Sequence, residues 1–317
     1  MDSAQNSPAV AGDFKTEFLH CWEQIPNKGL FFGLLAAWLM LFQFLGNGTF
    51  GYVDTASLMH WMYSAYKGDD GQGLLIPFVV LALIWWKRKE FLAAPNRIWT
   101  PGLALLAGAL ALHVLGYLVQ QPRVSIVALF SGVYALIGLI WGPAWMRTGF
   151  FPFFLFAFCI PISSIGEPVT FPLRIMASKL VWLISHGLGI DVVRDGNQLY
   201  DSGRTYRYEV AAACSGLRSL MAIFAIATIY GFLSFEKNWK RVLMMASAFP
   251  LAVVGNVTRL LSIIIAAEVF GQSGGDRVHD SFFFSLLPYI PAIISVAVLA
   301  RWFGSDKPET SSSPKPS

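Results

Sequence analysis

Three residues in the last third of the chain can together do acyl-transfer chemistry: Cys214, Arg259 and His279. A cysteine is a nucleophile only as a thiolate, so it needs a neighbouring base or cation and access to water. An arginine can stabilise that thiolate or a developing oxyanion. A histidine can take up and release protons near neutral pH. The three types together fit a cysteine nucleophile that attacks a carbonyl carbon.

Four more polar residues are expected to support this group, because each is next to one of its members in the sequence or about one helical turn away. They are Ser215, Arg218, Asn256 and Asp280. Arg218 follows Cys214 by one helical turn, so the two lie on the same face. Asn256 precedes Arg259 by three residues and shares its face in the same way. Asp280 either orients the preceding histidine or is only a loop charge.

Each member of the group also has a structural explanation when it is taken alone. A cysteine before Ser-Gly at a helix start can be a packing residue. Arg259 can be the buried partner of Glu209 or Glu268. His279 can be an ordinary interfacial side chain. The catalytic interpretation therefore depends on the three residues reaching one place from different segments.

The composition indicates a polytopic membrane protein. Of the 317 residues, 55% are hydrophobic and only 13% are charged, whereas a soluble domain carries about 25% charged residues. The net charge of +4 is too scattered to suggest nucleic-acid binding. Three cysteines are too few for a disulfide framework. Cysteines and histidines do not cluster at ligand spacing, so we expect no metal or redox cofactor.

Apolar segments predict an all-α fold with about eight transmembrane helices. The predicted spans are 29–45, 74–86, 101–119, 124–141, 150–162, 210–235, 242–267 and 282–303. The predicted domains are a cytoplasmic N-terminal segment at 1–28, a transmembrane domain at 29–303 with its catalytic part at 150–303, and a disordered cytoplasmic tail at 304–317. The first span shows no obvious cleavage site, so we expect it to be retained.

Positive charge predicts the orientation of these spans. Lysines and arginines favour cytoplasmic loops, and here they cluster at 87–89, at 237–241 and from Arg301 into the tail. With both termini in the cytoplasm, all three clusters fall inside. The segments 46–73, 120–123, 163–209 and 268–281 then lie outside.

This orientation brings the reactive residues to one membrane face. Cys214 lies near the outer end of 210–235, which runs inward. Arg259 lies in the outer half of 242–267, roughly 12 Å of helix from its end. His279 comes just before the last span. We therefore expect the thiol, the guanidinium and the imidazole to meet at the extracytoplasmic face.

The long outside segment before Cys214 is expected to fold at the membrane surface. Residues 173–188 have the spacing of an amphipathic helix, and the spacing does not decide whether this helix dips into the bilayer or lies on it. Asp195-Gly196 and Ser202-Gly203 are turn dipeptides between alternating runs. They predict a small β-hairpin or three-stranded ribbon that leads into Cys214.

The remaining histidines and cysteines are weaker candidates for chemistry. His20 and Cys21 are adjacent, without further ligands nearby. His60 lies among aromatic residues typical of a membrane interface. Cys159 lies among apolar neighbours, where a free cysteine behaves as a small hydrophobe. His113, within the third span, is either functional or a neutral side chain bonded to a neighbouring helix.

The three reactive blocks resemble the signature motifs of the exosortase/archaeosortase family. These are 213–219 (ACSGLRS), 256–259 (NVTR) and 279–280 (HD), and 193–197 (VRDGN) is similar to the family's hairpin. The resemblance covers roughly residues 150–303. It implies a polytopic transpeptidase, with sortase-like chemistry on an unrelated fold, in the prokaryotic inner membrane.

The same resemblance implies a substrate class and roles for the three residues. The substrates would be exported proteins with a C-terminal sorting signal made of a short motif, a transmembrane helix and a basic cluster. The enzyme would cleave near the motif and pass the protein to an acceptor. Cys214 would be the nucleophile, Arg259 its essential partner and His279 the third member. The other expected partner is membrane lipid, and nucleic acid is not expected.

One position departs from the family pattern, and two other functions remain open. Many relatives carry a glutamate two residues before the cysteine, where this chain has Ala212. The usual Pro-Glu-Pro substrate motif therefore cannot be assumed. A transporter with His113 and Arg259 along a polar path also fits the sequence. So does a non-enzymatic assembly factor for envelope polysaccharide.

Overall fold

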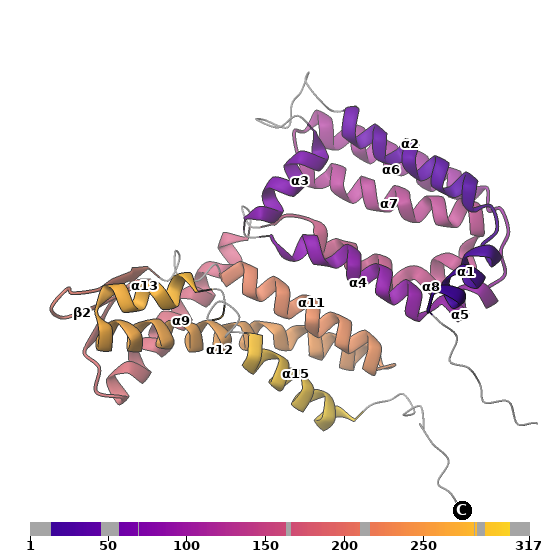
Figure 1. Cartoon of the computed structure of the whole chain (residues 1–317). Coiled ribbons are helices and arrows are strands. Elements are labelled where there is room, and N and C mark those ends of the chain that lie inside the picture. Colours follow the sequence, from indigo (N-terminus) through magenta and orange to yellow (C-terminus); the bar gives the residue numbers. More distant parts are fainter. Residues whose placement is uncertain are drawn as a thin grey trace, which may run out of the picture. The chain divides into compact units, whose positions relative to one another are not determined.

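The chain folds mostly into helices, which form two compact units (Figure 1). The structure is a computed structural model and describes residues 14–45, 57–68, 70–162, 166–209, 216–281, 283 and 289–304. The first unit comprises 1–63 and 76–160, and the second comprises 64–75 and 161–317.

The first unit is built from helices in the first half of the chain. They are α1 (Phe14–Gln24), α2 (Lys28–Phe44), α5 (Arg88–Ala93), α6 (Pro101–Leu118), α7 (Pro122–Trp141), α8 (Pro143–Phe154) and the 3-10 helix η1 (Leu155–Cys159), with the start of α3 (Leu58–Lys67) and most of α4 (Gln72–Trp86). Proline begins α6, α7 and α8, where its missing N–H costs nothing. Trp38 of α2 donates its indole N–H to Leu129 O of α7 at 2.9 Å.

Helices α6 and α7 approach closely because a glycine lies between them. A Cβ at Gly102 would lie 2.7 Å from the backbone nitrogen and 2.8 Å from the Cα of Leu139 on α7. These are backbone atoms, which cannot move aside as the end of a flexible side chain can. The close contact between α6 and α7 therefore requires a residue without a side chain at position 102.

We expect Gly102→Ala to destabilise the first unit by about 1–3 kcal/mol, as overpacking does elsewhere. Thermal unfolding of the detergent-solubilised protein measures the effect. Gly108→Ala on the same helix is the matched control, because a Cβ there meets nothing within 4 Å and alanine is the better helix former. Equal unfolding temperatures for the two variants would contradict the packing argument.

The second unit is organised around one long helix, α12 (Asn238–Phe270). The other elements are α9 (Glu167–Gly187), β1 (Val192–Asp195), β2 (Gln198–Asp201), β3 (Arg207–Glu209), α11 (Gly216–Ser234), α13 (Gln272–Asp280) and α15 (Tyr289–Phe303). Met244 and Ala248 in the first half of α12 belong to a core shared with α11 and α15. Leu260 and Ile264 in its second half belong to a core shared with α9 and the strands.

The strands form an antiparallel sheet in the order β1-β2-β3. Arg194 pairs with Leu199, and Leu199 pairs with Tyr208. Gly196 has a φ of 60° in the turn between β1 and β2, at the first of two central positions, where glycine is favoured. The sheet lies within the segment for which the sequence predicts a hairpin or ribbon.

Several helices are long and apolar enough to cross a membrane, as an all-α integral membrane protein requires. By length and composition, α6, α7 and α12 qualify among the described residues. The bent pairs α1–α2 (89°) and α3–α4 (106°) raise the number to as many as five if each pair is one span. The number of eight spans stays a prediction.

Two predicted loops and one predicted span differ from the observed elements. The predicted span 150–162 is not one helix, because α8 ends at Phe154 and the chain continues as η1. Pro152 lies inside α8 and removes a helical hydrogen bond. The predicted loop 46–73 contains α3. The predicted loop 268–281 is mostly helix, since α12 extends to Phe270 and α13 follows directly.

Candidate active site

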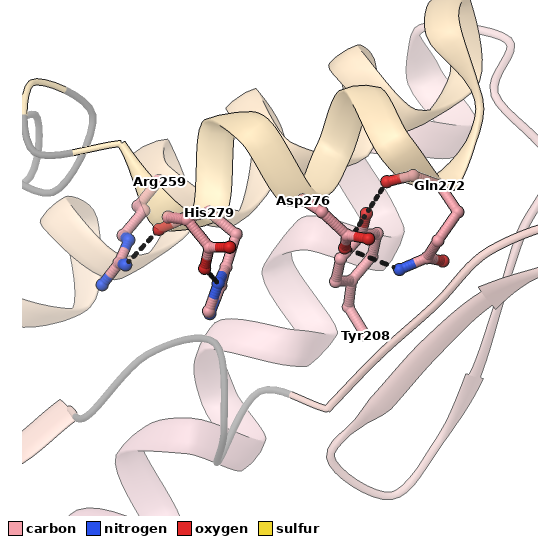
Figure 2. A network of polar contacts seen from close by, with 6 residues as sticks. Tyr208, Arg259, Gln272, Asp276 and His279 are labelled. Atoms are coloured by element: carbon pink, nitrogen blue, oxygen red, sulfur yellow. Dashed lines mark hydrogen bonds and ion pairs between the residues drawn. The ribbon is translucent and has the colours of Figure 1, made fainter.

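Helices α12 and α13 bring Arg259 and His279 together (Figure 2). Gly271 separates the two helices and has a φ of 71°, a left-handed conformation that glycine adopts without strain. Gly274 of α13 packs beside Phe270 and Ala266 of α12, which shows that the chain folds back. Arg259 Nη2 then donates to the main-chain oxygen of His279 at 3.3 Å.

The His279 ring is held by its neighbour Asp280. Nδ1 lies 2.7 Å from Asp280 Oδ1. The imidazole is 31% exposed and the carboxylate 78% exposed, so the pair is open to water. Nε2 makes no hydrogen bond to a residue that the structure describes. A carboxylate on one ring nitrogen leaves the other available to exchange a proton.

The Arg259 guanidinium has an unsatisfied donor. Its Nε is buried and lacks a hydrogen-bond partner within the described part of the chain. Buried polar groups are rarely left in this state without a reason. Glu268, the partner expected if Arg259 were structural, instead accepts a hydrogen bond from Tyr206 Oη at 3.2 Å. The side chain of Glu209, the other possible partner, lies outside the described residues.

Asn256 connects α12 to α11. Its side chain is 4% exposed, and its Oδ1 accepts a hydrogen bond from Ser219 Oγ at 3.0 Å. Asn256 lies one helical turn before Arg259, as its spacing predicts. It therefore contributes a connection between helices close to the arginine.

Three further predicted site residues have side chains that the structure does not describe. Cys214 and Ser215 lie outside the described residues, and so does the side chain of Arg218. The chain is anchored on both sides of this gap. Before it, Tyr208 of β3 bonds to α13, and after it Ser219 of α11 bonds to α12. The gap that holds Cys214 therefore joins two segments that are fastened to the helices carrying Arg259 and His279.

A tyrosine network that the sequence does not reveal fastens β3 to α13 (Figure 2). Tyr208 Oη lies 3.1 Å from Gln272 O and 3.3 Å from Asp276 Oδ1, which also accepts from Gln272 Nε2 at 2.8 Å. A Cβ at Gly275 would lie 2.7 Å from Tyr208 Cζ, so only glycine leaves room for the ring. Burial and then the charge of Asp276 raise the pKa of Tyr208 to about 12, so the hydroxyl stays a donor at neutral pH.

We expect Tyr208→Phe to destabilise the second unit by about 0.5–1.5 kcal/mol, the net value of a typical hydrogen bond, because Asp276 is exposed and binds water once this donor is lost. Denaturant unfolding in detergent measures the loss. Tyr200→Phe is the control, since the Tyr200 hydroxyl makes no hydrogen bond within the described chain. A similar loss in both variants would show that the network does not stabilise the sheet.

Two other histidines and Cys159 belong to the first unit. His113 is 5% exposed in the first unit, and its ring centroid lies 4.2 Å from that of Phe42. His20 lies 2.8 Å from Gln24 Nε2 on α1. Cys159 is buried in η1. Across the described residues, no group of three or more His, Cys, Asp or Glu could hold a metal ion.

Comparison with known proteins gives one match. A sequence profile of a family described as transmembrane exosortase matches residues 61–291. No curated protein and no solved structure matches the chain. The matched range contains Cys214, Arg259 and His279 together with the sheet and α11 to α13.

Proposed function

Because the chain belongs to the transmembrane exosortase family, we propose that it is a membrane-embedded cysteine transpeptidase that cleaves C-terminal sorting signals of exported proteins. The observation that carries the proposal is the meeting of Arg259 with His279, whose ring is oriented by Asp280. A half-buried guanidinium whose Nε has no partner among the described residues, beside an open imidazole, suits acyl transfer better than packing.

In the proposed mechanism, His279 takes the proton of Cys214 and the resulting thiolate attacks the scissile carbonyl carbon. The C–O π electrons move to oxygen, and Arg259 stabilises this oxyanion. Collapse of the intermediate breaks the C–N bond, and His279 gives its proton to the leaving amine. The thioester is then attacked by an acceptor amine or by water, which returns the thiolate.

The length of α12 supports an active site at the edge of the membrane. Its 33 residues span about 50 Å, whereas the hydrocarbon core is about 30 Å thick. If the basic pair Lys240 and Arg241 marks the cytoplasmic boundary, about 20 residues reach the opposite boundary near Leu261. Arg259 then lies at that boundary, and the end of α12 stands outside the membrane with the sheet.

The ends of the helices agree with the proposed orientation. Lys240 Nζ at the start of α12 donates to Phe303 O at the end of α15 at 2.8 Å. Both positions belong to basic segments expected in the cytoplasm. Arg259, which contacts His279, lies in the second half of α12, away from this basic end. We therefore propose cytoplasmic termini, eight spans and an extracytoplasmic active site.

The proposed substrate carries its own transmembrane helix, which would lie beside the helices of the second unit. Its basic end would remain in the cytoplasm, and its scissile bond would lie near Arg259. Ala212 stands where many relatives have glutamate, so the proposal does not assume their usual short motif. A transporter or a polysaccharide assembly factor remains the alternative.

A processing assay tests the proposal. The chain is coexpressed with an exported protein from the same genome that ends in a motif, a transmembrane helix and a basic cluster. Gel mobility and intact mass report loss of the C-terminal segment. If every such protein keeps its full length when it is coexpressed with the wild-type chain, the proposal is wrong.

A further inference from the structure

A polar cavity of about 360 Å³ lies between the end of α9 and the first strand of the sheet. Its lining residues come from these two segments: Lys179, Trp182, His186, Asp191, Val192, Val193 and Arg194. The volume falls in the range of small-molecule sites. None of these residues takes part in the site around Arg259 and His279.

Basic groups in this cavity are available to a ligand. Arg194 Nη1 donates to Gly196 O at 2.9 Å and lies 3.4 Å from Ser178 Oγ, which fixes the guanidinium against α9. Lys179 is exposed and makes no hydrogen bond or ion pair within the described chain. The carboxylate of Asp191 already accepts a hydrogen bond from Ser202. The cavity therefore favours an anion.

The cavity borders an exposed apolar face of the same helix. Successive residues of a helix turn by 100°, so positions 179, 182 and 186 lie between the buried and exposed faces of α9. The buried face includes Ser178 and Ser185. The exposed face carries apolar side chains: Met176, Leu180, Leu183 and Ile184. Leu183, 60% exposed, has no covering residue in the described structure.

We propose that the cavity and this face together bind one anionic phospholipid. Its phosphate would lie between Lys179 and Arg194, and its acyl chains would cover the exposed face of α9. Helix α9 is not among the described helices that are apolar enough to cross a membrane. We therefore place it in the membrane interface, as an amphipathic helix. Trp182 lines the cavity between the two regions, where tryptophan anchors proteins at membrane interfaces.

The charge arrangement distinguishes this lipid from other occupants. A zwitterionic lipid offers the same acyl chains, but its own cation opposes Lys179 and Arg194. A soluble phosphate offers the same anion and leaves the apolar face uncovered. Of these three occupants, the anionic phospholipid is the one that satisfies both halves of the site.

The test measures lipid-dependent stabilisation of the whole chain in detergent. Dioleoylphosphatidylglycerol is expected to raise the unfolding temperature with saturation, as a ligand of the folded state does. Dioleoylphosphatidylcholine and glycerol 3-phosphate are expected to do so much less. Equal stabilisation by phosphatidylcholine would show that the negative charge of the headgroup does not matter. Equal stabilisation by glycerol 3-phosphate would show that the acyl chains do not matter. Either result would overturn the proposal.

A matched pair of charge reversals locates the site. Lys179→Glu is expected to weaken the apparent affinity for phosphatidylglycerol at least about fivefold. Arg204→Glu makes the same change of charge at an exposed position in the loop between β2 and β3 and is expected to keep the wild-type affinity. Equal affinities in the two variants, whether both are weakened or both unchanged, would overturn the proposed site.

Discussion

Replacing Cys214 by alanine is expected to abolish processing of a tripartite substrate. The proposed mechanism needs a thiolate that forms a thioester, and alanine offers no nucleophile. Loss of a nucleophile in an assembled catalytic group lowers the rate by at least about 10⁴-fold, which leaves only full-length substrate on the gel. Intact mass of the wild-type enzyme during turnover should show a thioester adduct that the variant lacks.

Two further variants make this result specific. Cys21→Ala removes the partly exposed thiol of α1 and is expected to process the substrate normally. Cys214→Ser keeps a hydroxyl of similar size, but it is a far weaker nucleophile at neutral pH, so processing is expected to remain very low. Normal processing by Cys214→Ala would contradict the peptidase and favour a transporter or an assembly factor.

The sequence predicts the helices of this fold well where apolar runs are long. Segments 101–119 and 124–141 correspond closely to α6 and α7. The sequence predicts a loop at 268–281, because this segment connects two predicted spans, whereas residues 272–280 are helical. They form α13 because Gly274 and Gly275 allow tight packing on α12 and on Tyr208. Such tertiary contacts override local helix propensity.

The predicted meeting of Arg259 with His279 depended on topology, and its geometry could not be predicted. Charge placement in the sequence predicts that both residues lie at one membrane face. It does not show that the guanidinium reaches the main-chain oxygen of His279. Nor does alternation in β3 show that Tyr208 bonds to Asp276. These contacts depend on how α13 folds back at Gly271, which no local pattern encodes.

Replacing Arg259 is expected to have the second large effect on substrate processing, because its Nε has no partner among the described residues. We expect Arg259→Gln to slow processing by about 10²- to 10³-fold, as loss of one oxyanion donor does elsewhere. Glutamine keeps a polar side chain of similar length but has no charge. Arg259→Lys restores the charge without the planar fork and is expected to recover part of the rate. Single-turnover cleavage, followed by mass, measures both variants.

Arginine could instead act by stabilising the Cys214 thiolate, and alkylation separates the two roles. Iodoacetamide reacts with thiolates, and in a Cys21→Ala background the only other cysteine besides Cys214 is Cys159, which is only 1% exposed. If Arg259 acts on the oxyanion, Arg259→Gln should leave the pH dependence of Cys214 alkylation unchanged while cleavage slows. A shift of that dependence to higher pH would assign Arg259 to the thiolate, because loss of a neighbouring cation disfavours the charged form. Wild-type cleavage by Arg259→Gln would exclude both roles and leave the guanidinium as a structural group.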